Sequence, residues 1–320
     1  MKRISALICL IVAICAANAF ALFDVNYYGV RALGMGQAFT AVANDVNAPI
    51  YNIAGTGLLD RIEVAGMSSR LFAGEEGLNF TTNFIGTVVP LSRDKSYGTI
   101  SAGWGNYSDV GLYDENIVYV GYARHLGDLF ETELFDIALG VNFRYLHHKV
   151  NGRELSTPVE GYLSEDAFTF DAGVLIKLKN GISAGYSGKY LTSPDVRFFK
   201  ETSEKENVQI HHVIGLAYFN ELLPLLRLPN FTIAGDFEIR EHDNVIMLGA
   251  ETKIKISESF LSFRAGGWQE QLTFGVGYSI PFGSTEADRS YLTVDYAFIL
   301  PLEIQNTIGS HFFGLSYRFK

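Results

Sequence analysis

Charged side chains recur at every second position in two segments of the C-terminal half, residues 230–240 and 244–256. Residues two apart share one face of a β-strand, so each segment presents a charged face if it is extended. We expect these charges, which have mixed signs, to pair across neighbouring strands and fill an interior. The alternative is a polar constriction that selects solutes. The network, with three charges from later segments, comprises Asp236, Glu238, Arg240, Glu251, Lys253, Arg264, Asp295 and Arg318.

Other arrangements that could carry chemistry are weak. The histidine pairs His147–His148 and His211–His212 are adjacent in sequence, so on a strand the two rings point to opposite faces and cannot chelate one metal ion. Gly34–Gly36 is glycine-rich but lies in no βαβ unit. No nucleophile-elbow motif occurs. We therefore predict a protein that is not an enzyme and has no cofactor or metal.

The first 21 residues have the features of a secretory signal peptide. Lys2 and Arg3 precede the apolar run 4–17, and small residues satisfy the cleavage rule at Ala19 and Ala21. We predict that residues 1–21 are removed by cleavage near Ala19 or Ala21.

Cysteine content and charge narrow the class of protein further. Cys9 and Cys15 both lie in the predicted signal peptide, so the mature chain would have no thiol and no disulfide. The net charge of −10 argues against a nucleic-acid partner, because phosphate binding needs a basic surface.

No later apolar run is long enough for a membrane-spanning helix. An exported chain of this kind can still cross a membrane as a closed barrel.

From residue 61 to 320 the sequence alternates apolar with polar or small residues in segments of ten to fifteen residues, separated by Gly, Asn, Asp and Ser clusters. We count about fourteen such segments, and an even number is expected of a bacterial barrel. Short turns such as Lys179–Asn180 alternate with two long connections, 151–164 and 192–206. These features predict an all-β, antiparallel up-and-down barrel that crosses the bacterial outer membrane.

A secreted, soluble β-sandwich that binds a ligand is the alternative fold, because sandwich strands also alternate. Two observations favour the membrane barrel. The apolar face is rich in aromatic residues, since the chain has 24 Phe and 17 Tyr. The other face carries charges instead of a second apolar core, as lipid outside and a polar lumen inside would require. Outer-membrane lipid is therefore the expected partner of the apolar face.

Residues 22–60 do not alternate and are rich in glycine and alanine. Small residues permit close packing, and we expect a short helix over Gln37–Asn44. A mostly apolar segment of this kind is best buried inside the barrel, so we predict an N-terminal plug, or hatch, in the lumen.

The sequence resembles the FadL-like outer-membrane barrels, and in particular their PorV/PorQ branch. The resemblance is carried by Arg31–Asp45, Tyr51–Gly55, Phe263–Gly267, Leu272–Gly277 and Val294–Ala297. It implies a fourteen-strand barrel with an N-terminal hatch. Ile53 stands where the family usually has proline. The last strand, from Phe313 to Phe319, resembles a terminal insertion signal, with Lys320 as an added residue.

Two functions follow from the resemblance. The first is passive uptake of a small hydrophobic ligand, with an apolar pocket between the plug and the barrel. The second is a scaffold or shuttle for a secreted-protein partner, as in type IX secretion, held by the connections 151–164 and 192–206. We expect Arg31, Asp45 and Asn52 to bond to the charged network. The candidate plug residues are Arg31, Phe39, Val42, Asp45, Ile50, Asn52 and Ile53.

Overall fold

The computed structural model describes residues 23, 27–74, 79–92, 94–109, 111–127, 134–154, 160–199, 205–223, 228–241, 243–283, 289–302, 304 and 307–320. The predicted signal peptide, residues 1–21, lies outside the described residues.

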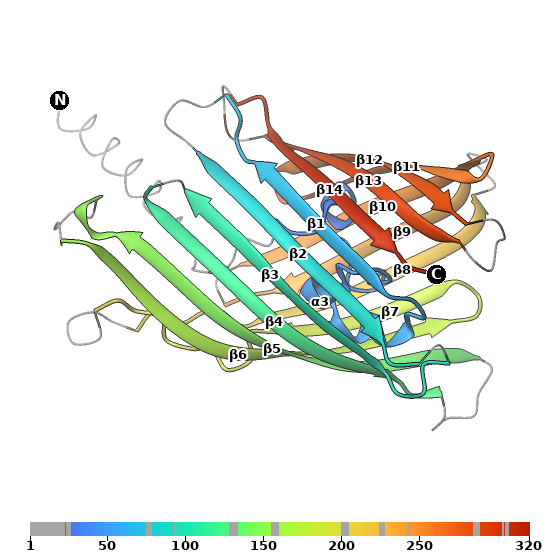
Figure 1. Ribbon diagram of the computed structural model, residues 1–320, viewed down its shortest axis with the longest axis horizontal. Helices are drawn as coiled ribbons and strands as arrows, with labels where there is room; N and C mark the ends of the chain where they lie inside the picture. The colour runs from blue at the N-terminus through green and yellow to red at the C-terminus, as the bar shows by residue number, and fades with distance from the viewer. Residues whose placement is uncertain are drawn as a thin grey trace, which may run out of the picture.

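The described chain folds into a closed barrel of fourteen antiparallel strands, in which each strand pairs with its neighbours in sequence and β1 pairs with β14 (Figure 1). This confirms the predicted fold class, and closure excludes the β-sandwich. The strands are β1 Glu63–Arg70, β2 Phe80–Pro90, β3 Thr99–Asp109, β4 Tyr113–His125, β5 Phe135–Asn151, β6 Tyr162–Leu178, β7 Ile182–Lys189, β8 His211–Leu223, β9 Leu228–Ile239, β10 Asn244–Ile256, β11 Ser259–Trp268, β12 Gln271–Phe282, β13 Ser290–Pro301 and β14 Ser310–Arg318.

The outer face of the barrel is apolar because alternate residues of each strand point outward. Ile85, Leu216 and Phe313 are 60%, 61% and 62% exposed, although side chains of this size are normally buried in a protein surrounded by water. An apolar band of this extent suits a barrel whose outside is covered by lipid. None of the helices in the described part of the chain is long and apolar enough to span a membrane.

The two ends of the barrel differ. At the terminal end, β1 begins at Glu63 and β14 ends at Arg318, to the right in Figure 1. At the opposite end, here called the long-loop end, the connection 190–210 joins β7 to β8, and β5 and β6 extend to 17 residues each. Tyr190, Val196 and Val208 of that connection are buried, so its described part folds inward toward the lumen.

Residues 27–60, the lumenal segment, run through the inside of the barrel, where Figure 1 shows them in blue among the strands. The segment contains α2 Val30–Gly34, α3 Ala48–Tyr51 and the 3-10 helix η1 Ile53–Leu58, and η2 Gly152–Glu154 lies after β5. α2 packs on β11–β14, whereas η1 packs on β2–β6. The segment therefore bridges opposite walls.

The helix predicted over Gln37–Asn44 was wrong, because these residues form turns. Gly36 and Gln37 have left-handed φ angles of 61° and 59°, which a right-handed α-helix does not contain, so no helix can continue through these two residues. The backbone N–H groups of Phe39 and Thr40 then donate to the Asp236 carboxylate of β9, at 2.9 and 2.8 Å. A wall carboxylate thus supplies the bonds that helical carbonyls would otherwise have made.

Inward-facing glycines of the strands allow the lumenal segment to lie directly on the wall. A Cβ added at Gly249 would overlap the carbonyl oxygen of Met35, and one at Gly185 would overlap that of Thr40. Backbone can approach this closely only where the wall residue has no side chain. The wall glycines include Gly140, Gly173, Gly185, Gly215, Gly249, Gly266, Gly275 and Gly314.

Candidate functional site

Arg31 joins the lumenal segment to the barrel wall. Its Nε and Nη2 donate to the two carboxylate oxygens of Glu251 at 2.9 and 2.7 Å, and its Nη1 donates to Asp45 at 2.9 Å and Asn44 at 2.6 Å. Burial disfavours the charged guanidinium, but Glu251 and Asp45 outweigh burial and hold the pKa of Arg31 above its ordinary value. Arg31 is therefore a permanent cation, and we call this set of contacts the Arg31 latch.

Glu251 also accepts from the barrel itself. Arg264 donates to it from β11 at 2.8 Å and to Asp295 of β13 at 2.6 Å, and the Lys253 ammonium lies 3.5 Å away. The predicted cross-strand pairing is confirmed for Glu251 and Arg264, which lie directly opposite on β10 and β11, but it was wrong for the charges of β9 and β10. The register places Glu251 opposite Thr232 and Asp236 opposite Met247, so the two charged stretches lie at different heights.

The remaining charges of the predicted network form separate groups. Glu238 pairs with His211 at 2.6 Å and with Arg240 at 3.2 Å near the long-loop end. Arg318 donates to Glu63 at 2.5 Å at the terminal end, where Glu63 also accepts from the backbone of Val46 at 3.0 Å. The network is thus divided into clusters, each of which bonds a different part of the lumenal segment or wall.

Asn52 stabilises a bend of the lumenal segment and takes no part in the charged clusters, contrary to prediction. Its Nδ2 donates to the carbonyl oxygens of Thr40 at 2.9 Å and Val174 of β6 at 3.0 Å. Its Oδ1 accepts from the backbone of Ala54 at 3.1 Å. The side chain is fully buried, so these bonds satisfy polar groups that water cannot reach.

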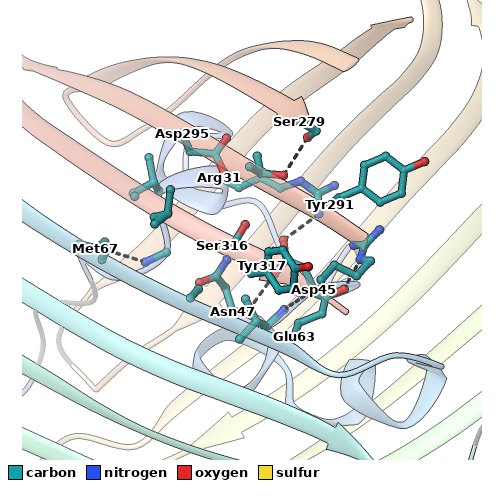
Figure 2. Close-up of a pocket in the computed structure, with 18 of the residues that line it drawn as sticks. Arg31, Asp45, Asn47, Glu63, Met67, Ser279, Tyr291, Asp295, Ser316 and Tyr317 are labelled. Atoms are coloured by element: carbon teal, nitrogen blue, oxygen red, sulfur yellow. Dashed lines mark hydrogen bonds and ion pairs between the residues drawn. The ribbon is translucent and has the colours of Figure 1, made fainter. Parts of the chain in front are cut away.

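A cavity of about 360 Å³ opens toward the terminal end, between the lumenal segment and the wall formed by β11–β14, β1 and β2. Figure 2 shows side chains from both sides gathered around it, including Arg31, Asp45, Glu63 and Tyr291. We call it the inner cavity. Its lining is amphiphilic: charged groups alternate with Val30, Val46, Met67, Phe84 and Phe260.

The predicted apolar pocket beside Phe39, Val42, Ile50 and Ile53 does not correspond to this cavity. These four side chains are at most 3% exposed and none lines the inner cavity. They form core contacts instead, such as the edge-on packing of Phe39 against Tyr51 at 5.4 Å between ring centroids. They stabilise the lumenal segment and do not form the surface that a ligand would meet.

A second cavity of about 110 Å³, the outer cavity, lies at the long-loop end. Tyr27, Tyr51 and Trp268 line it together with Lys189 of β7, which is only 4% exposed. The Lys189 ammonium lies 5.6 Å from the centre of the Tyr51 ring. Within the described part of the chain, no residue forms an ion pair or hydrogen bond with Lys189. In the sequence, the only indication that Lys189 faces the lumen was its position on the polar face of an alternating segment.

A further buried ion pair escaped the sequence analysis. Arg144 of β5 donates through Nε to Asp171 of β6 at 2.5 Å, and Asp171 also accepts from the backbone of Tyr190 at 3.0 Å. Asn142, Arg144 and His148 share the inward face of β5, so alternation alone indicated a polar wall here. The pair connects the strands to the inward-folded connection 190–210.

The two histidines of the pair at residues 147 and 148 point to opposite faces, as predicted. His148 is buried and contacts the Val196 carbonyl oxygen at 2.8 Å, whereas His147 contacts Asp166 on the outer face at 2.7 Å. No group of His, Cys, Asp or Glu within the described residues could hold a metal ion.

No protein-family model and no curated protein sequence matches this chain. Its fold is similar to that of the toluene transporter TodX of P. putida, with 11% identity, a TM-score of 0.57, and coverage of 93% of this chain and 99% of that chain. It is also similar to the CymD monoaromatic hydrocarbon channel, with 11% identity, a TM-score of 0.55, and coverage of 93% and 98%. A FadL homologue of Pseudomonas aeruginosa aligns with a TM-score of 0.49, 11% identity, and coverage of 91% and 98%. At these identities the likeness to TodX and CymD shows that this chain shares their barrel fold and nothing finer.

Proposed function

We propose that the chain is an outer-membrane barrel that carries small hydrophobic molecules passively, with the lumenal segment as its plug. The apolar outer face supports placement in a membrane, and the predicted signal peptide supports export. Two barrels of the same fold are described as a toluene transporter and a monoaromatic hydrocarbon channel. The hatch resemblance further supports a place in the PorV/PorQ branch.

The observation that carries this proposal is that the inner and outer cavities share the lumenal segment as a wall. Thr40 and Tyr51 face the outer cavity, whereas Arg31 and Asp45 face the inner one. A shift of this segment would connect the two cavities, so a molecule bound at one end could leave at the other. Polar bonds hold the segment at a few points, and apolar contacts such as those of Phe39 and Ile50 hold it elsewhere, so a shift would exchange both kinds of contact.

The outer cavity also indicates the ligand. Its aromatic walls suit a small ring, and the buried Lys189 ammonium faces the same space without a hydrogen bond or ion pair among the described residues. Asp236 and Glu238 also line this cavity, but Asp236 accepts from the backbone of Phe39 and Thr40, and Glu238 pairs with His211 and Arg240. An unpaired cation in a low-dielectric site is stabilised by an anionic ligand. We infer a preference for ring compounds that carry a carboxylate over those that do not.

The alternative role, a scaffold for secreted proteins, gains no support from the solved neighbours. It requires the long connections to project outward, whereas Tyr190, Val196 and Val208 of the connection 190–210 turn inward and are buried. We therefore favour a small-molecule ligand.

Trp268 offers a direct test, because the chain has only two tryptophans and the other, Trp104, lies on the outer face. In Trp104→Phe protein, Trp268 is the sole tryptophan and reports on the outer cavity. We expect saturable quenching by bromobenzene and stronger quenching by para-bromobenzoate. Lys189→Met should weaken para-bromobenzoate binding on the order of ten-fold and leave bromobenzene unchanged.

The same protein in proteoliposomes should admit these compounds faster than lipid alone. Absence of saturable quenching by either compound, in protein that still runs as a folded barrel on unheated gels, would overturn the proposal. Equal affinities for the two compounds would overturn the assigned role of Lys189.

A further inference from the structure

A continuous row of polar side chains crosses the outer face of six neighbouring strands, from β1 to β6. Its members lie directly opposite one another in the register of each strand pair. All of them belong to the outward-facing set of their strands. We call this the polar row, and it consists of Ser68, Asn83, Asn106, Asn116, His147 and Asp166.

The members of the polar row bond to one another only loosely at its centre. Ser68 donates to Asn83 at 2.8 Å, whereas the Asn83–Asn106 and Asn106–Asn116 contacts are each 3.4 Å long. The indole N–H of Trp104 donates to Asn116 at 3.1 Å. Asn106 also donates to the Glu115 carbonyl oxygen at 3.2 Å. Each amide offers two donors and two acceptor positions, so one donor of Asn83, both donors of Asn116 and one acceptor position each of Asn83 and Asn106 are left for a ligand.

The surroundings of the polar row are those of a membrane boundary. The next row toward the terminal end is largely apolar and aromatic, and comprises Gly66, Ile85, Trp104, Val118, Tyr145 and Phe168. Toward the long-loop end the outward residues become charged, with exposed Arg70 on β1 and the Lys149–Asp114 pair, 3.2 Å apart, on β5 and β4. The polar row thus separates an apolar band from a charged rim.

The polar row does not follow the plane of a bilayer. Strands of a membrane barrel tilt by about 35–45°, so a row perpendicular to them climbs by roughly 3 Å per strand. The Ser68 end is therefore deepest, and Ser68 lies directly opposite Phe313 of β14, which is 62% exposed. Hydroxyl and amide groups beside a lipid-facing phenylalanine are costly unless polar partners reach them.

We infer that this face binds the phosphorylated saccharide headgroup of an outer-leaflet glycolipid. This rests on the outer-membrane location proposed above. Sugar hydroxyls would exchange hydrogen bonds with Asn83 and Asn106, and a sugar ring would lie against Trp104, which is 37% exposed. Arg70 has no ion-pair partner among the described residues, and so is free to bind a phosphate.

Below the headgroup, the acyl chains would lie on the apolar outer face that begins at Ile85 and Val118, 60% and 41% exposed. A glycolipid fits better than an ordinary phospholipid because the polar row offers many neutral hydrogen-bonding groups spread over several strands. A phospholipid headgroup is smaller and would satisfy only the charged rim.

The test compares detergent-purified barrel incubated with lipid A or with phosphatidylglycerol, by native mass spectrometry. The variant Asn83→Leu/Asn106→Leu removes the centre of the polar row. The matched control, Asn244→Leu, replaces an outward amide at the same end of the barrel but on β10, outside the polar row. We expect wild type and the control to retain lipid A, and the double variant to retain it less by a factor on the order of ten.

Equal retention by the double variant, or equal retention of phosphatidylglycerol by wild type, would overturn the inference. A row-dependent doubling of the barrel's mass would also overturn it, because a second copy would then occupy the face. Failure to fold is checked on unheated gels, and Arg70→Gln, which leaves the polar row intact, should also weaken lipid A retention. The Trp268 titration concerns only the lumen, so its failure and the failure of this inference are distinguishable.

Discussion

Arg31 and Glu251 are 220 residues apart in sequence, yet they form two parallel hydrogen bonds of 2.9 and 2.7 Å inside the barrel. The guanidinium belongs to the lumenal segment and the carboxylate to β10, so this pair joins the lumenal segment to the barrel wall. The geometry matches the bidentate pairing that makes arginine–carboxylate contacts strong. The pair is therefore the first place to test whether the lumenal segment is held or released.

Arg31→Met should loosen the lumenal segment. The substitution removes four charge-assisted hydrogen bonds and leaves the buried Asp45 without its cation, which we expect to cost about 3–5 kcal/mol of unfolding free energy. Urea unfolding in detergent would measure the loss, and planar-bilayer recordings should show a higher open-channel conductance. Lys179→Ala is the control, because it breaks a 2.7 Å pair with Asp136 that is exposed to solvent. An unchanged conductance in Arg31→Met would show that the Arg31 latch does not hold the lumenal segment in place.

Gly249→Ala should displace the lumenal segment without changing any charge. The new methyl group would collide with the carbonyl oxygen of Met35, a backbone atom that can move only with its segment. We expect a destabilisation of about 1–3 kcal/mol and a rise in conductance. Gly66→Ala adds the same methyl group to the outer face, where the nearest atom would be 3.7 Å away. Similar effects in both variants would contradict the close-contact argument.

The Arg144–Asp171 pair should behave as a unit. Arg144→Leu leaves the Asp171 carboxylate, which is 2% exposed, without its cation and should cost about 3–5 kcal/mol. The double variant Arg144→Leu/Asp171→Leu removes both charges and should recover a large part of that loss. Thermal unfolding followed by gel mobility would compare the three proteins. Additive losses would indicate that the two residues contribute independently.

Tyr51 should make stability depend on alkaline pH. Burial, followed by the charges of Asp45, Asp236 and Glu238, raises the pKa of its hydroxyl well above the ordinary value, and the hydroxyl donates to the Tyr28 carbonyl oxygen at 2.8 Å. Above about pH 10 the unfolded chain releases this proton and the folded chain keeps it, so stability falls as pH rises. Tyr51→Phe should cost about 1 kcal/mol at neutral pH and show a shallower alkaline loss. Identical alkaline slopes would contradict this assignment.

The barrel could be predicted from sequence because its signal is local. The alternation in Leu272–Ile280 or Phe168–Leu178 assigns each side chain to a face without reference to any other strand. The strand number followed from counting such segments. The segment before Arg61 stood out because it does not alternate, which was enough to separate it from the wall.

Local patterns also identified the charged inner residues, but not their partners. Asp236 and Glu251 were recognised as facing the same side, yet one bonds the backbone of Phe39 and Thr40, and the other bonds Arg31 and Arg264. Which inner residues meet depends on the register of each strand pair and on the path of the lumenal segment. Neither is encoded by the spacing within one strand.

The sequence by itself therefore determined the strands, their two faces and a separate N-terminal segment, since each depends on neighbours two or a few residues away. Only the tertiary structure decided where the cavities lie, that Lys189 faces one of them, and that six polar residues align across β1–β6. The physical reason is that barrel closure brings together residues from distant strands at heights set by their stagger. Such contacts depend on the stagger of all the strands in the closed barrel and cannot be read from one strand alone.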